Sequence, residues 1–208
     1  FEMTKFFGKG IITGFARING FPVAIFANDS NFYAGSMSAE GAQKTSRFIR
    51  LCDTFRIPIV SLVDEPGFLI GPDAERAGTI LHGTEAVLAT TESKVPWSTI
   101  MIRKSFGVAA AAHYGPDGYV LAWPSAESGP LPLEGGVAVA FKKEIASAKN
   151  PEAKRKELEE KMAKNQSPFP RAESFSVHEI IDPRETRKYI ALWAERIQSQ
   201  LKASLMNR

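Results

Sequence analysis

Hydrophobic and polar residues alternate along residues 11–28, around an Asn-Gly dipeptide at residues 19–20. Asn-Gly between two alternating runs strongly favours a type I′ turn, which joins two antiparallel strands. We therefore predict a hairpin whose strands are residues 11–18 and 21–28. Pro22 falls near the start of the second strand, where a missing backbone N–H is tolerated.

Residues 38–55 change to a helical period, with apolar or small side chains three or four positions apart. These positions are Ala42, Thr45, Phe48, Ile49, Cys52 and Phe55. Ser38 and Glu40 suit the start of a helix, because a serine side chain caps free N–H groups and a carboxylate favours the positive end of the helix dipole. The stripe predicts a helix that packs on a sheet and buries Cys52.

The rest of the chain alternates between short apolar runs and helical patterns. The runs that predict strands are 57–63, which we expect to be covered on both faces, 97–103 and 119–123. The patterns that predict helices are 74–92, 107–113, 151–165 and 183–206. One face of the first of these helices carries Ile80, Leu81, Thr84, Val87 and Leu88. Such alternation favours an α/β domain with parallel crossovers.

Composition sets the broad class of the protein. The chain has 208 residues, of which 44% are hydrophobic and 24% are charged, and a formal net charge of +3. These values fit one globular domain, and no apolar run approaches the roughly 20 residues of a membrane-spanning helix. Basic residues are scattered, so we expect no nucleic-acid or membrane partner. The single cysteine, Cys52, fits a reducing compartment, the cytoplasm or the mitochondrial matrix.

Two segments place backbone suited to an anion at the end of a predicted strand. They are residues 64–71 and 103–111. In the second, the strand passes through Gly107 into a helix of very small residues, whose first N–H groups lack intrahelical partners and carry partial positive charge. If an amide of Gly67 or Phe68 points to the same spot, the two turns form an oxyanion hole. The alternative is a plain strand-to-helix turn, which is common in α/β proteins.

Side chains with catalytic potential are few. His82, His113 and His178 lack a metal-ligand spacing, so we predict no metal site and structural roles, with His113 nearest to the small-residue turn. Asp64 and Glu65 are adjacent and would face opposite sides of a strand. No G-x-S-x-G or P-loop is present, and no G-x-G-x-x-G opens a helix after a strand. Amides without an acid or base suit a reaction in which the substrates transfer the proton themselves.

Six ordered segments resemble those of the β subunits of biotin-dependent acyl-CoA carboxyltransferases. Val63–Gly71 resembles the family's V-D-x-P-G-F-L-x-G segment, and Arg103–Gly107 resembles its R-K-x-Y/F-G turn. The other segments are Gly14–Gly20, Arg47–Asp53, Ala122–Glu127 and Ile181–Arg187. The resemblance implies a crotonase-like fold, an α/β superhelix of ββα units with C-terminal helices. It assigns residues 1–208 to the single C-terminal carboxyltransferase domain, with the N-terminal domain absent from this chain.

The resemblance also implies a site shared between two domains. In the family, the first domain holds the acyl-CoA and the second faces carboxybiotin, so this chain would supply the biotin-facing half. The carboxyl group would pass from carboxybiotin to the α-carbon of the acyl-CoA. By position, the implied residues are Gly67, Phe68, Val108 and Ala109 for a backbone oxyanion hole, Gly107, Val108 and Ala109 for biotin, and Ala110 and Ala111 for the acyl substrate.

The family's partners extend these expectations. They are an N-terminal carboxyltransferase domain or subunit, a biotin carboxylase and a biotin carrier protein, and members commonly form homo-oligomers. The amphipathic helix at 183–206 suits a subunit contact or packing on its own domain equally well.

The chain departs from the family pattern near the second turn. Val108 replaces a glycine, Ala110 stands at a tyrosine position, and residues 128–136 carry two prolines. If these changes close the site, the chain is a non-catalytic assembly domain. A second alternative is a biotin-dependent decarboxylase of a malonyl-type CoA thioester, whose active-site residues would look the same.

Overall fold

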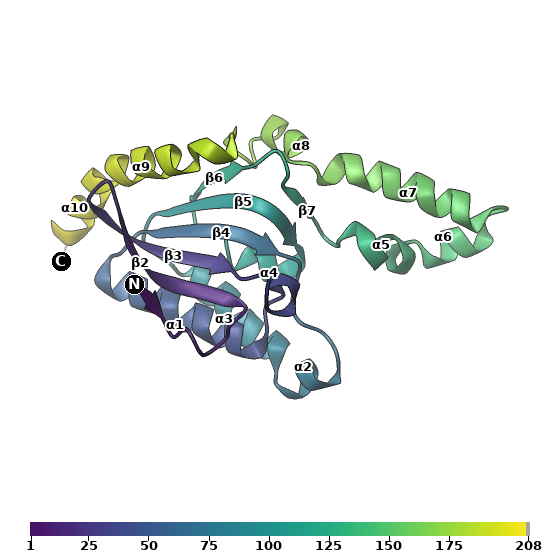
Figure 1. Ribbon diagram of the computed structural model, residues 1–208, viewed down its shortest axis with the longest axis horizontal. Coiled ribbons are helices and arrows are strands. Elements are labelled where there is room, and N and C mark those ends of the chain that lie inside the picture. Colours follow the sequence, from purple (N-terminus) through teal and green to yellow (C-terminus); the bar gives the residue numbers. More distant parts are fainter. Residues whose placement is uncertain (207–208) are drawn as a thin grey trace.

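A computed structural model describes residues 1–206 of the chain (Figure 1). Across these residues runs an eight-stranded sheet with the order β1-β2-β3-β4-β5-β6-β8, and β7 pairs with β5. The strands are β1 Glu2–Met3, β2 Ile11–Ile18, β3 Phe21–Asn28, β4 Ile59–Glu65, β5 Trp97–Phe106, β6 Tyr119–Ala122, β7 Glu127–Gly129 and β8 Glu179–Ile180.

Helices follow most of the parallel strands. The helices are α1 Ala39–Phe55, α2 Pro72–Arg76, α3 Thr79–Thr91, α4 Gly107–Ala111, α5 Leu133–Ala140, α6 Lys142–Ser147, α7 Pro151–Gln166, α8 Pro168–Glu173, α9 Thr186–Arg196 and α10 Gln198–Met206, with 3-10 turns at Tyr33–Gly35 and Pro183–Glu185. In the described part of the chain, no helix has the length and apolar composition needed to cross a membrane.

The predicted hairpin and the parallel crossovers are both confirmed. β2 and β3 pair antiparallel from Ile11–Asn28 to Ile18–Phe21, and Asn19 and Gly20 have φ angles of 49° and 86° in the turn. From β3 onward, the pairs β3–β4, β4–β5, β5–β6 and β6–β8 are all parallel. The α/β class therefore holds, with an antiparallel edge at the N-terminal side.

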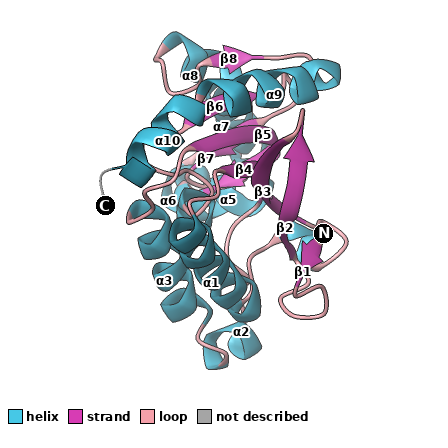
Figure 2. Ribbon diagram, turned by 90° about the vertical axis from the view of Figure 1, so that its left-hand side faces the viewer, coloured by secondary structure: helices cyan, strands magenta, loops and turns pink. Residues whose placement is uncertain are grey.

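Helices cover both faces of the sheet (Figure 2). α1 and α3 pack on one face and α9 on the other. The adjacent residues Ile59 and Val60 of β4 are both fully buried, and they belong to opposite core clusters. This confirms the prediction of a strand that is covered on both sides.

α1 buries the predicted stripe except at its last position. Ser38 caps the helix by accepting a hydrogen bond from the Gly41 N–H at 3.1 Å. Cys52 is fully buried, as expected. Phe55 is 66% exposed, so its assignment to the buried stripe was wrong. It lies in the final turn beside Arg56, where φ is +56° and the chain leaves the helix.

The predicted helix 74–92 is divided in two at Gly78, whose φ of +73° breaks the helical path. The apolar face named from its sequence is largely exposed, with Ile80 at 62%, Leu81 at 65% and Leu88 at 49%. α3 instead buries a face of small residues: Thr79, Gly83, Ala86, Ala89 and Thr90. Small side chains allow α3 to lie close to α1 and to the ring of Phe68.

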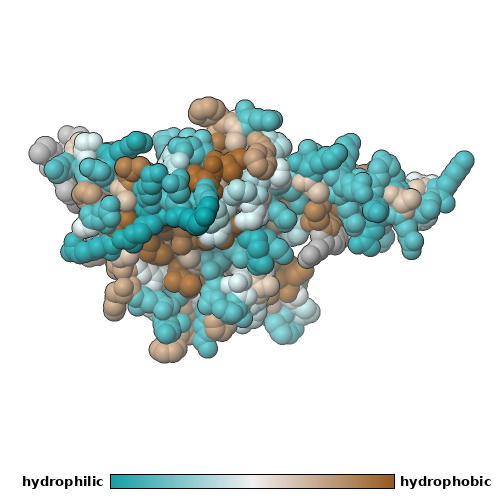
Figure 3. Space-filling view, turned by 45° about the horizontal axis from the view of Figure 1, so that its top comes forward, coloured by the Kyte–Doolittle hydropathy of each residue, from teal (hydrophilic) through white to brown (hydrophobic). Residues whose placement is uncertain are grey.

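A helical arm, α5 to α7, extends away from the sheet (Figure 1) and is mostly hydrophilic (Figure 3). α7 confirms the charged helix predicted at 151–165, and Lys154 joins it to Glu144 of α6 at 3.2 Å. α5 was not predicted, because its sequence contains two adjacent glycines, which disfavour a helix. The helix expected at 183–206 is interrupted at Ile197, between α9 and α10.

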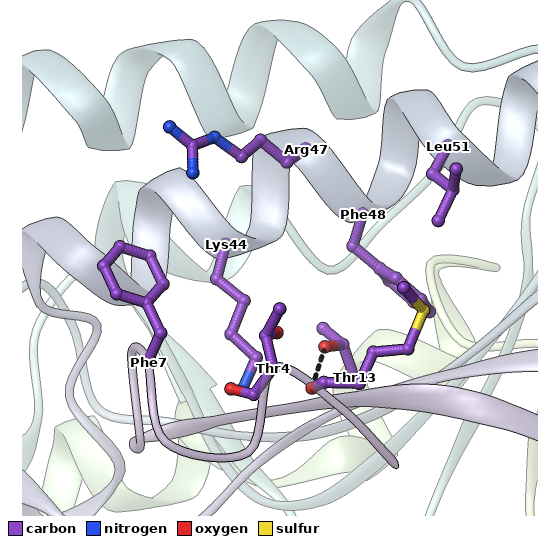
Figure 4. A pocket seen from close by; sticks show the side chains of 8 residues that line it. Thr4, Phe7, Thr13, Lys44, Arg47, Phe48 and Leu51 are labelled. Atoms are coloured by element: carbon purple, nitrogen blue, oxygen red, sulfur yellow. Dashed lines mark hydrogen bonds between the residues drawn. The ribbon is translucent and has the colours of Figure 1, made fainter. Parts of the chain in front are cut away.

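A pocket of about 250 Å³ lies between the N-terminal segment and α1 (Figure 4). Its lining is Met3, Thr4, Phe7, Thr13, Lys44, Arg47, Phe48 and Leu51. Lys44 is buried there, and its Nζ donates to the carbonyl oxygens of Thr4 at 3.1 Å and Ile11 at 2.6 Å. Burial lowers the pKa of Lys44. The ammonium therefore ties the N-terminal segment to β2 and α1.

We expect Lys44→Met to lower the free energy of unfolding by about 1–3 kcal/mol, because two carbonyl groups lose their donor. Arg47→Met is the matched control, since Arg47 is exposed on the same helix and its side chain makes no hydrogen bond within the described chain. It should change stability by less than about 0.5 kcal/mol. Urea denaturation of both variants checks this, and equal losses would refute the assignment.

Burial raises the pKa of the Cys52 thiol to about 12, and the neighbouring Asp53 carboxylate acts in the same direction. Only the thiolate reacts rapidly with disulfide reagents. We therefore expect no labelling of the native chain by such a reagent at about pH 8, and complete labelling in denaturant. Fast labelling of the native chain contradicts the buried position.

Candidate active site

Two turns leave the sheet at the same edge. β4 and β5 are parallel neighbours, and Glu65 at the end of β4 lies in register with Ser105 near the end of β5. The turn at residues 66–68 and helix α4 therefore start side by side, as Figure 1 shows. This is the carboxyl edge, where ligands bind in open parallel sheets.

The first turn has one free amide. The Gly67 N–H donates to Glu65 Oε1 at 3.0 Å, and the Gly67 carbonyl accepts from the Met37 N–H at 3.1 Å. The Leu69 N–H donates to the Met37 carbonyl at 2.9 Å. No acceptor within the described chain takes the Phe68 N–H. Of the two amides considered from the sequence, Gly67 is thus occupied internally and Phe68 is available.

The backbone conformation at position 67 requires a glycine. Its φ is +134°, a conformation that side chains other than hydrogen rarely adopt, and the space beside it is open. The glycine therefore sets the direction of the Phe68 amide, and a Cβ at this position would meet no other atom within 4 Å.

The second turn is a helix start without a side-chain cap. Gly107 has φ +64°, and the preceding Phe106 offers no capping side chain, so the first-turn amides, including those of Val108 and Ala109, have no intrahelical acceptor. The Val108 side chain is 67% exposed. Pro130, which follows β7, places its carbonyl oxygen beside Gly107.

The two alanines assigned to the acyl substrate differ in exposure. The Ala110 side chain is buried and the Ala111 side chain is exposed. Only Ala111 therefore presents its methyl group at the surface of this chain.

Asp64 and Glu65 face opposite ways, as predicted. Asp64 accepts from Arg103 Nε at 3.0 and 3.1 Å and from the Lys104 N–H at 3.1 Å. The hydrogen bond between the Arg103 and Asp64 side chains and the charge of Asp64 raise the pKa of Arg103. The pair joins β4 to β5 where their register shifts after Val63. Arg103 and Lys104 thus hold β5 to β4 at the sheet edge from which both turns leave.

Glu65 is fully buried and its carboxylate is surrounded by donors. Oε1 accepts from the amides of Gly67 at 3.0 Å and Met37 at 3.3 Å. Oε2 accepts from Asn28 Nδ2 at 3.0 Å and lies 3.6 Å from His113 Nε2. Sequence reasoning missed this role. The available signal was an acidic residue ending an apolar strand, since a buried carboxylate needs partners.

His113 is buried and the other histidines lie elsewhere. Its Nδ1 is 3.0 Å from Ser61 Oγ, and its ring stacks on Phe26 with centroids 4.3 Å apart. His82 pairs with Glu85, also on α3. Within residues 1–206, no three histidine, cysteine or carboxylate side chains form a group that could hold a metal ion.

Comparison with known proteins decides the family. A match to the carboxyl transferase domain covers residues 1–207. The chain belongs to the carboxyl transferase domain family. It is 38% identical over 98% of its length to the propionyl-CoA carboxylase carboxyltransferase subunit of Haloferax mediterranei. It is also 38% identical, over 91% of its length, to the methylmalonyl-CoA carboxyltransferase 12S subunit of Propionibacterium freudenreichii subsp. shermanii.

Solved structures of this family confirm the crotonase-like fold. The transcarboxylase 12S structure with methylmalonyl-coenzyme A bound matches 96% of this chain with a TM-score of 0.89 and 37% identity. The geranyl-CoA carboxylase β subunit of P. aeruginosa shares the fold, with a TM-score of 0.84 at 23% identity. This carboxyl transferase domain spans about 40% of the first relative's length and 39% of the 12S chain.

We expect Gly107→Ala to destabilise this carboxyl transferase domain by about 1–2 kcal/mol, the cost of a side chain in the left-handed region. Gly10→Ala is the control, because the space for a Cβ is similar, with the nearest atom at 3.5 Å in both cases, and only Gly107 has a positive φ. Chemical denaturation compares the two. Equal stabilities would show that the second turn does not need its conformation.

Proposed function

We propose that this chain supplies the carboxybiotin-facing half of a carboxyltransferase active site, completed by an N-terminal domain that carries the acyl-CoA. The observation that carries the proposal is that the turn with the free Phe68 amide and the uncapped start of α4, with the Val108 and Ala109 amides, leave the same sheet edge. Backbone amides held in place stabilise a developing oxyanion. The family membership gives this geometry its chemical context.

The residues present fit a biotin ureido oxygen. The Phe68 amide has no acceptor of its own in the described chain, and the Val108 side chain stands outward, at 67% exposure, instead of covering the turn. When bound, carboxybiotin supplies the transferable carboxyl group and the atom that accepts the α-proton. The chain's own part is to hold the oxygen with amides, so no side-chain base is required. Gly107 provides the close approach, and Ala111 borders the acyl side.

The same half-site supports the reverse reaction. The methylmalonyl-CoA decarboxylase subunit alpha of Propionigenium modestum is 39% identical over 91% of this chain. Decarboxylation of a malonyl-type thioester is therefore the second candidate. Both directions place the same charge on the same oxygen, so the amides serve both.

Partners follow from the proposed chemistry. A biotin carboxylase would load a biotin carrier protein, which would deliver carboxybiotin to this edge. A homo-oligomer would join halves from different subunits, and the similar transcarboxylase 12S assembles as a hexamer. We propose the cytoplasm or the mitochondrial matrix as its compartment; the similar propionyl-CoA carboxylase beta chain of Mus musculus is mitochondrial.

The outward Val108 side chain weighs against a purely structural domain. A closed site would need that side chain to pack over the turn, and it is exposed. An assembly role remains the outcome of a verified two-domain complex that transfers no carboxyl group.

We expect Val108→Pro to lower carboxyl transfer to free biotin by about 100-fold to 1,000-fold, because proline removes one oxyanion donor. Proline is tolerated in the first helical turn, where the N–H has no intrahelical acceptor. Val108→Ala keeps the amide and should stay within about threefold of the parent, a small change for a side chain that leaves the donors in place.

The assay uses methylmalonyl-CoA or malonyl-CoA as donor, this chain, and a matching N-terminal carboxyltransferase domain. Retained activity in the proline variant, with the complex intact by gel filtration, would sink the assignment of the Val108 amide.

A further inference from the structure

The buried side chains of Glu65 and His113 connect the two turns of the site. Glu65 closes the first turn through the Gly67 amide at 3.0 Å. His113 follows α4, and its own N–H donates to the Ala110 carbonyl at 2.9 Å, which ends that helix. Glu65 Oε2 and His113 Nε2 are 3.6 Å apart, and both side chains are fully buried. One buried contact thus connects the loops that carry the Phe68 and Val108 amides.

We infer that the Glu65–His113 pair is a positioning device that fixes the distance and orientation between the two halves of the oxyanion hole. This inference rests on the proposed function and deepens it. Neither side chain is assigned any contact with biotin or with the reacting atoms. Both act through the backbone segments they hold.

The hydrogen bonds around His113 define its direction. Ser61 Oγ lies 3.0 Å from Nδ1, and the ring stacks on Phe26 with an interplanar angle of 5°. Its carbonyl accepts from Thr99 Oγ1 at 2.8 Å. With Ser61 as donor to Nδ1, the Nε2–H faces the Glu65 carboxylate. The ring cannot rotate away without losing both the stack and the serine contact.

The carboxylate is chemically specific at position 65. One oxygen accepts from two amides, those of Gly67 and Met37, and the other accepts from Asn28 and lies 3.6 Å from His113 Nε2. A glutamine keeps one acceptor oxygen, but its NH₂ group would then face two N–H groups and could accept from neither. Misplacement of a catalytic donor by about 1 Å can cost on the order of 100-fold in rate. Glu65→Gln is therefore a small change in volume with a large expected effect on alignment.

A matched control exists at the opposite edge of the sheet. Asp53 Oδ1 accepts from Ser93 Oγ at 2.9 Å and from the amides of Lys94 at 3.0 Å and Val95 at 3.3 Å. It is a carboxylate that holds a turn, as Glu65 is, but its turn precedes β5 at the amino end. Asp53→Asn makes the same carboxylate-to-amide change away from the site, and its Oδ1 can still accept these three hydrogen bonds.

The experiment measures kcat, the KM for biotin and the KM for the acyl-CoA in the two-domain complex. The variants are Glu65→Gln, His113→Leu, their double variant and Asp53→Asn. We expect each site variant to lower kcat/KM for biotin by about 10-fold to 100-fold and to leave the KM for the acyl-CoA within about twofold, since that substrate binds the other domain. The double variant should be no worse than the poorer single, because coupled residues are non-additive.

Asp53→Asn should keep kcat/KM near the parent value. If His113→Leu fails to fold, His113→Phe takes its place, because a phenyl ring can keep the stack on Phe26 and carries no N–H toward Glu65. Unchanged kcat/KM in folded Glu65→Gln, or losses that multiply in the double variant, overturns the inference.

If the parent complex transfers no carboxyl group, the proposed function fails separately. The pair is then judged by a double-mutant cycle on the urea midpoint. Non-additive shifts for Glu65→Gln and His113→Leu support the bridge between the turns, and additive shifts overturn it.

Discussion

Parallel pairing of β4 with β5 is the constraint on which the candidate site depends. Parallel neighbours end at the same edge, so the chain must leave both strands side by side. One exit becomes the Gly67 turn and the other becomes α4. At this edge of the sheet, Asp64 and Arg103 form an ion pair on the exposed side, and Glu65 and His113 lie in contact on the buried side. The site is therefore a property of backbone placement, built by side chains that face away from it.

A site made of amides has different requirements from a site made of acids and bases. Each donor is covalently part of the chain, so its direction is set by φ and ψ and by the hydrogen bonds of neighbouring groups. Gly67 and Gly107 supply two unusual backbone conformations, with φ of +134° and +64°. A substitution at a buried residue that holds such a turn can then change the reaction rate without contacting a substrate. The buried Glu65 carboxylate therefore matters as much as the Gly67 turn that it holds.

The sequence predicts the parts of the fold that local patterns control. Asn19 and Gly20 predict the hairpin, and the apolar stripe of α1 predicts which face of that helix is buried. Glycine at 107 before small residues announces the second turn. Other features depend on tertiary contacts: α3 buries alanines and leaves Ile80 and Leu81 exposed, because its neighbours need a close approach.

The parts of the site that escaped prediction are long-range contacts. Glu65 meets Asn28, Met37 and His113, which are 28 to 48 positions away along the chain. Nothing in the local spacing specifies such a meeting. The occupied Gly67 amide follows from the same network, so the sequence could not indicate which amide of the proposed turn is free.

The most direct test of the account is the amide NMR spectrum of the isotopically labelled chain during titration with biotin. The account predicts saturable shifts centred on the amides of Phe68, Val108 and Ala109, with little change at the Gly67 amide, which Glu65 already holds. Shifts confined to other surfaces, such as the pocket beside Lys44, or no saturable shifts at all, would contradict the placement of the biotin-facing site at this edge.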